Sequence, residues 1–274
     1  MTSALIISAK ALSYTGILFG IGAATHCALG IATSRRWLWV AAAVVLLAVG
    51  VRLLGLNLEI VGDPSDLFDF SMFGWMWPGV RVQIFAFLAG AVLIAVAAVF
   101  RRPLIAVLGA IVLAVGFGLA GHAQSEGMPG GLWGLVSLHV LIAGFWFLAP
   151  LTLWPRSDKH RSDVVHRLQR FSRMAVYAVP LMIVAGLWLA LVISDGPGGL
   201  IGTPYGRLLL LKTGVITVAL ALGAYNKVRV TDRIGSGEAT ALTHLRRTLS
   251  LELALFGSAL LAVAAATTVF GPHS

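Results

Sequence analysis

Eight long apolar runs constrain this chain more than any other feature. A membrane-spanning helix needs about 20 mostly apolar residues, because ~30 Å of hydrocarbon must be crossed at ~1.5 Å per residue. Backbone amides in lipid have to be bonded within their own segment, so such runs form helices. The sequence therefore predicts an all-α polytopic membrane protein, a bundle of eight transmembrane helices in a single domain over residues 1–274. The runs fall at about 11–33, 37–56, 75–100, 103–121, 132–154, 171–194, 205–226 and 245–270.

The composition excludes several classes of protein. Charged residues make up 11% of the chain, against about 25% in soluble domains, so lipid has to be the outer solvent. The formal net charge of +9 does not indicate nucleic-acid binding, because the basic residues mostly occupy short turns between apolar runs. The sequence contains no GxxxxGK[ST], HExxH or GxSxG motif, so neither ATP hydrolysis nor an enzymatic activity is expected.

The turns predict how the chain is oriented. Four connections, which all fall on one side under an eight-span count, carry 15 of the 20 basic residues. Basic turns mark the cytoplasmic side, so both termini are predicted to lie on the external side. The basic connections are Arg35-Arg36, Arg101-Arg102, 156–173 and 227–247; the acidic residues of the other side are Glu59, Asp63, Asp66, Asp69, Glu126 and Asp195.

Histidines and methionines near the external side are the candidate metal ligands. His122 ends the fourth run and His139 lies about seven residues into the fifth, so the two imidazoles are placed to face one another. Met128 sits on the turn between them, and Met72 and Met76 flank the start of the third run. Imidazole with thioether is a ligand set suited to soft Cu(I). The alternative is structural, since buried histidine bonds to neighbouring helices and methionine fills gaps.

Other polar groups inside the runs have both functional and structural interpretations. His26, beside Cys27 in the inner half of the first run, is a weaker candidate for an inner metal site, because adjacent helical residues point about 100° apart. Lys212 is expected to pair with an acidic or carbonyl group, and Glu252 with Arg167, Arg170 or Arg173. Gly16 and Gly20 form a GxxxG pattern that allows close helix approach.

A set of ordered blocks resembles the copper resistance D (CopD) family of bacterial inner-membrane proteins. The blocks span about residues 115–271, and one departure from the family is Phe147-Leu148-Ala149 after Trp146, where glycines are usual. The blocks are GHA at 121–123, LHVLIAGFWFLAPL at 138–151, RFSRMAVYAVPLMIVAGLW at 170–188, GTPYGRLLLLK at 202–212 and LRRTLSLELALFG at 245–257.

The resemblance implies a location in the bacterial inner membrane, which makes the external side, and with it both termini, periplasmic. It further implies copper import from periplasm to cytoplasm, often alongside a small periplasmic copper-binding partner. It also implies that His122 and His139 are copper ligands. Two alternatives remain at this point: a b-type haem electron carrier, which needs two histidines facing each other across a porphyrin, and a copper-binding or assembly scaffold that moves no ion. A Soret absorption band separates the haem alternative from the others.

Overall fold

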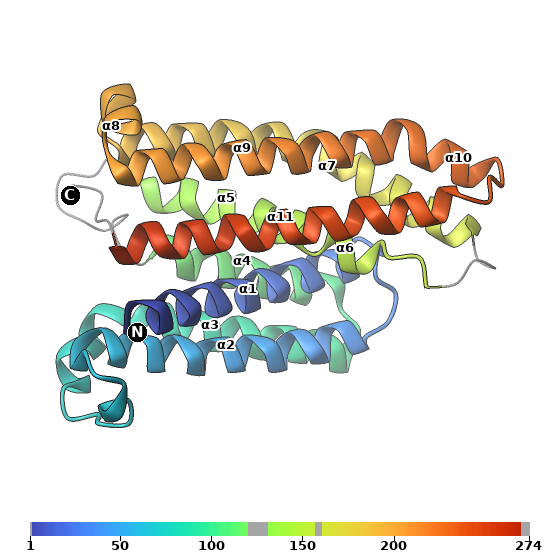
Figure 1. Cartoon of the computed structure of the whole chain (residues 1–274). Coiled ribbons are helices and arrows are strands. Elements are labelled where there is room, and N and C mark those ends of the chain that lie inside the picture. Colours follow the sequence, from blue (N-terminus) through green and yellow to red (C-terminus); the bar gives the residue numbers. More distant parts are fainter. Residues whose placement is uncertain (1, 120–130, 157–160, 270–274) are drawn as a thin grey trace.

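The computed structural model describes residues 2–119, 131–156 and 161–269. These residues form helices and connections, with no strand among them. Figure 1 shows the long helices running alongside one another as a bundle. The prediction of an all-α polytopic protein is confirmed at this level. The longer helices are α1 (Thr2–Ala28), α2 (Arg36–Val61), α3 (Phe73–Phe100), α4 (Pro103–Gly118), α5 (Leu132–Phe147), α7 (Arg161–Ile193), α9 (Pro204–Tyr225) and α11 (Ala241–Val269).

Shorter elements join or extend these helices. A 3₁₀ turn, η1 (Pro64–Asp66), lies between α2 and α3, and α8 (Gly196–Gly202) lies between α7 and α9. The segment α6 (Ala149–Thr152) extends α5. A π-helical segment, η3 (Asn226–Val230), and α10 (Thr231–Gly235) extend α9.

Seven helices of the described chain are long and apolar enough to cross a membrane. The remaining predicted span, at 103–121, corresponds to α4, whose 16 residues cover about 24 Å at the rise of an α-helix. The eight-span count therefore stays a prediction. The helix α7 begins ten residues before the predicted run, at Arg161. Val164 and Leu168 of this extension are buried, so its apolar face packs although its average composition is polar.

The two ends of the bundle differ in charge. Figure 1 shows α6 and α10 at one end, and α8 at the opposite end together with the start of α1. The arginine-rich connections adjoin α6 and α10, as the turn pattern predicted. We call this the basic end. The assignment of this end to the cytoplasm, and with it the periplasmic location of the termini, stays a prediction.

Helix α1 lies between two hydrophobic cores. One core is built mainly on α1 to α4, and the other on α5 to α11. A Cβ added at Gly16 would lie 2.6 Å from Ala48 Cβ, and one at Gly20 would lie 2.4 Å from Val45 Cγ2. Both distances are too short for real side chains, so the close approach predicted from the GxxxG pattern is confirmed, and its partner is α2.

A second close approach joins α1 to α5. A Cβ at Gly22 would lie 2.5 Å from the carbonyl oxygen of Gly144, and one at Gly144 would lie 2.6 Å from Ile21 Cγ2. The glycines that the family blocks place after Trp146 are missing here, but Gly144, just before it, allows the contact. This contact brings together the helices that carry His26 and His139.

Candidate metal centre

Only some of the predicted metal ligands lie in the part of the chain that the structure describes. His122 and Met128 lie outside the described residues. His139, His26, Met72 and the neighbouring Met76 are described. Among the residues that the structure describes, no three histidine, cysteine or acidic side chains are grouped to hold a metal ion. A metal centre in this part of the chain therefore has to be argued from single ligands and their surroundings.

His139 lies at the contact between α5 and α7. Its side chain is half-buried, and its Nδ1 lies 3.3 Å from the carbonyl oxygen of Met182. A carbonyl oxygen only accepts, so Nδ1 carries the proton and Nε2 keeps its lone pair. Within residues 2–119, 131–156 and 161–269, no group forms a hydrogen bond with Nε2. One ring nitrogen anchored to a backbone carbonyl and the other left open is the usual arrangement of a metal-binding histidine.

His26 has the opposite arrangement. It is fully buried, and its Nε2 donates to the carbonyl oxygen of Phe145 at 2.8 Å. Its Nδ1 accepts from the hydroxyl of Thr152 at 2.7 Å, and its ring packs edge-on against Phe145 and Phe171. Both nitrogens are thus engaged by the protein, and the side chain joins α1 to α5 and α6. A metal at His26, which stays a prediction, has to displace one of these bonds.

His26 and His139 do not form a facing pair. His26 is bonded to Phe145, which lies six residues after His139 on α5, a separation of about 9 Å along the helix axis. A bis-histidine haem site needs one free nitrogen from each ring. Only His139 offers one here.

The methionines at the start of α3 belong to a different helix contact. Met72 is exposed and Met76 is half-buried. Helix α3 packs mainly on α2 and α4, whereas His139 lies between α5 and α7. The structure therefore does not bring these two methionines to His139. Their role as copper ligands stays a prediction. If they bind copper, they do so before the ion reaches His139.

Lys212 of α9 is the charged neighbour of His139. It is the basic residue whose charge is close enough to influence His139, and its side chain is half-buried. The ion pairs within the described chain are Lys10 with Glu59 and Arg233 with Glu238, so no described carboxylate neutralises Lys212. The acidic partner expected for Lys212 is not found there. A cationic group in this position opposes a second positive charge at His139, and opposes a divalent ion twice as strongly as a monovalent one.

The expectation that Glu252 pairs with an arginine is wrong. Its Oε1 accepts from Asn226 Nδ2 at 3.0 Å, and Thr248 Oγ1 donates to Asn226 Oδ1 at 2.7 Å. Two of the arginines that were its expected partners bond elsewhere: Arg167 donates to the carbonyl oxygen of Thr152 and Arg170 to that of Gly30. Backbone carbonyls near the basic end thus take the guanidinium groups, and the buried carboxyl relies on a neutral amide.

Two further residues of this centre were not predicted from the sequence. Met182 supplies its carbonyl rather than its sulfur, and Gly186 supplies the space in which the His139 ring lies. Their spacing of four residues places them on the same face of α7. A small residue in a run of large apolar ones was the available signal, but it does not reveal which helix fills the space.

The comparisons with known proteins agree with the blocks in the second half of the chain. Residues 165–266 match the family model of copper resistance protein D. This range covers most of α7 and α11 with everything between them, including Met182, Gly186 and Lys212, but not α5 with His139. No curated protein and no solved structure matches the chain significantly.

Proposed function

We propose, from the match of residues 165–266 to the copper resistance protein D (CopD) family model, that this membrane protein moves copper ions across the bilayer. The direction we propose is import, from the periplasm to the cytoplasm across the bacterial inner membrane. The match to this family model supports copper handling, and the long apolar helices support a membrane protein. Transport by the chain itself, without catalysis, is the step proposed here.

The observation that carries this proposal is the open Nε2 of His139. It is a ligand atom inside the bundle whose ring is anchored by Met182 and seated against Gly186. Both anchoring residues belong to the segment that matches the family. The family-matching helices thus position a histidine that lies outside the match. A ligand fixed in this way binds a metal without first losing another partner.

The copper ion that suits this site is Cu(I). Neutral imidazole and thioether are suited to soft Cu(I), and the charge of Lys212 favours a monovalent over a divalent cargo. We propose that Met72 and Met76 capture the ion and that His139 receives it, with His122 and Met128 as the further ligands suggested by the sequence. Exchange between ligands keeps the ion coordinated, which avoids the high free energy of a bare charge in lipid.

Delivery and energy supply follow from the same proposal. The sequence contains no nucleotide-phosphate loop, so the copper gradient and exchange between carriers drive the movement. A small periplasmic copper-binding protein would deliver the ion at the end of the bundle opposite the basic end. His26, near the basic end, would act as a later ligand only if its bond to Thr152 or Phe145 opens.

The test is Cu(I) flux into proteoliposomes that contain a Cu(I)-sensitive dye. We expect the parent to transport, His139→Ala to lose most of the flux, and the double variant His122→Ala, His139→Ala to lose it all. His244→Ala, which changes a histidine at the basic end without a hydrogen bond to its ring in the described structure, is the matched control. Equal flux through parent and His139→Ala, with both proteins folded, would contradict the proposal. A Soret band in the purified parent would point to haem instead.

A further inference from the structure

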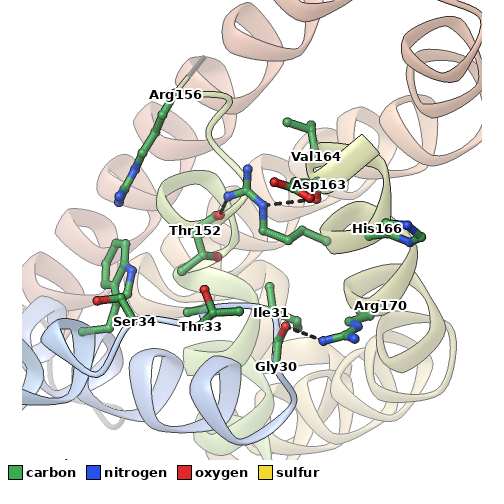
Figure 2. Close-up of a pocket in the computed structure, with 13 residues that line it drawn as sticks. Gly30, Ile31, Thr33, Ser34, Thr152, Arg156, Asp163, Val164, His166 and Arg170 are labelled. Atoms are coloured by element: carbon green, nitrogen blue, oxygen red, sulfur yellow. Dashed lines mark hydrogen bonds between the residues drawn. The ribbon is translucent and has the colours of Figure 1, made fainter. Parts of the chain in front are cut away.

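A hollow of about 640 Å³ opens at the basic end of the bundle. Its walls come from the α1–α2 connection, from the segment after α6 and from the first turns of α7, and Figure 2 shows these three parts around it. Three arginines line it: Arg156, Arg167 and Arg170. Among the lining residues that the structure describes, Asp163 is the only acidic one, against three arginines.

The three guanidinium groups are held by neutral partners. Arg167 Nη1 donates to the carbonyl oxygen of Thr152 at 2.6 Å, and Arg170 Nη1 donates to that of Gly30 at 2.8 Å, a bond drawn in Figure 2. Arg156 lies over the Trp37 ring, with Cζ 5.8 Å from its centroid. None of them forms an ion pair with a described carboxylate. Each guanidinium has five N–H donors, so most of these donors remain available in the hollow.

The arginines are also held near one another. Arg156 and Arg167 are close enough for their like charges to repel. Carbonyl bonds and the Trp37 ring fix these side chains in place, yet they do not neutralise their charge. Asp163 is the one described carboxylate beside these guanidinium groups. Three arginines around one hollow still leave an excess of positive charge, and arginine binds a phosphate group in a bidentate way.

The position of the hollow identifies the source of the phosphate. It lies where α1 ends at Ala28 and just before the apolar part of α7 begins, so it is at the level where the hydrocarbon meets the headgroups. Ile31, Val164 and Trp37 give it apolar walls beside the arginines. Basic hollows between helices at the cytoplasmic surface are suited to anionic lipid headgroups. We propose that this hollow binds the phosphate of an anionic phospholipid, with Arg156, Arg167 and Arg170 as its ligands.

The hollow is connected to the interior of the bundle. Arg167 bonds to the carbonyl of Thr152, and the Thr152 hydroxyl donates to His26 Nδ1. A lipid phosphate that binds Arg167 therefore competes with the carbonyl of Thr152, the residue whose hydroxyl holds the His26 ring. None of the three arginines bonds to a proposed copper ligand, so lipid binding in this hollow does not require copper transport.

Native mass spectrometry tests the site on the full chain in detergent. The probe is dioleoylphosphatidylglycerol, with dioleoylphosphatidylcholine and inorganic phosphate as comparison ligands. We expect the parent to retain phosphatidylglycerol, and the variant Arg156→Gln, Arg170→Gln to bind it about a hundredfold more weakly, since each arginine–phosphate bond lost weakens binding about tenfold. Arg167 is left unchanged because it also supports Thr152.

The matched control removes the same charge outside the hollow. Arg102→Gln, Arg247→Gln changes two exposed arginines at the basic end and should bind phosphatidylglycerol like the parent. The site is overturned if this control loses phosphatidylglycerol binding as much as the hollow variant does. It is also overturned if the hollow variant retains the lipid as well as the parent does. Inorganic phosphate that displaces the lipid at equal concentration overturns the lipid as its ligand. Melting temperatures without lipid show whether each variant is folded, and the lipid-induced shift in melting temperature must follow the same order.

Discussion

The imidazole of His139 lies directly against the backbone of Gly186. A Cβ added at Gly186 would stand 3.0 Å from Cε1 of the ring and 3.4 Å from Nδ1. The variant Gly186→Ala should therefore push the ring away and lengthen its bond to Met182. We expect its affinity for Cu(I) to fall about tenfold, which corresponds to ~1.4 kcal/mol, as measured by competition with a Cu(I) chelator.

The control for this variant is Gly223→Ala on α9, where an added Cβ meets nothing within 4 Å. Alanine in a helix interior is more favourable than glycine by roughly 1 kcal/mol, so this variant should melt slightly higher and bind Cu(I) as the parent does. An unchanged affinity in Gly186→Ala would show that the position of the ring does not matter for binding.

The contact between α1 and α5 predicts a large loss of stability. In Gly22→Ala, the new Cβ would lie 2.5 Å from both the Gly144 carbonyl oxygen and Leu148 Cβ, so the two helices have to separate. Overpacking of this kind destabilises by about 1–3 kcal/mol. Thermal unfolding in detergent should show a lower melting temperature, whereas Gly50→Ala, at an open position of α2, should not. Equal melting temperatures for these two variants would show that the contact is not tight.

The buried carboxyl of Glu252 depends on the Asn226 amide. In Asn226→Leu, the carboxyl loses its donor at 3.0 Å and the Thr248 hydroxyl loses an acceptor. An unsatisfied buried polar group costs about 1–3 kcal/mol, so this variant should melt well below the parent. Glu252→Gln keeps an oxygen that accepts from Asn226 and removes the charge, so it should melt at or above the parent temperature. If Glu252→Gln is as unstable as Asn226→Leu, a partner other than Asn226 must hold the carboxylate.

The turn between α10 and α11 should respond to acid. The Glu238 carboxylate accepts from the Arg233 guanidinium and from Thr240 Oγ1, and these bonds lower the pKa of Glu238 from 4.5 to about 2. A lowered pKa in the folded state stabilises the fold above the unfolded pKa, and this stabilisation is lost as the pH falls through about 2. Parent and Glu238→Gln should therefore differ in melting temperature at pH 7, and the difference should shrink between pH 4.5 and 2.

Asp232→Asn serves as the control for this pH dependence. Asp232 is exposed, and its carboxylate makes no hydrogen bond or ion pair within the described ranges. Its variant should follow the parent across the whole pH range. A difference between parent and Glu238→Gln that persists undiminished at pH 2 would contradict the assigned bonds.

The helices could be predicted from the sequence because lipid imposes one strong requirement on each apolar run. The ends of the helices are harder to predict than their existence. Helix α7 starts at Arg161, ten residues before the apolar run, and its polar first turns bury Val164 and Leu168. Gly16 and Gly20 predict that another helix approaches the first span closely, but only the structure shows that this helix is α2.

The pairing of side chains across helices could not be predicted in the same way. In lipid, the outward face of a helix is as apolar as its inward face, so hydrophobic periodicity does not show which residues meet. That is why Glu252 was assigned to an arginine instead of Asn226. It is also why the Met182 carbonyl went unrecognised as the partner of His139, although His139 itself was singled out as a buried imidazole.

The most direct test of the central claim is the copper K-edge X-ray absorption spectrum of the Cu(I)-loaded protein, recorded for the parent and for His139→Ala. If His139 Nε2 is a copper ligand, the parent spectrum shows imidazole nitrogen scattering at about 2.0 Å, as is usual for metal–imidazole bonds. That scattering decreases in His139→Ala and is retained in the His244→Ala control. Identical copper environments in the parent and in His139→Ala would contradict the account.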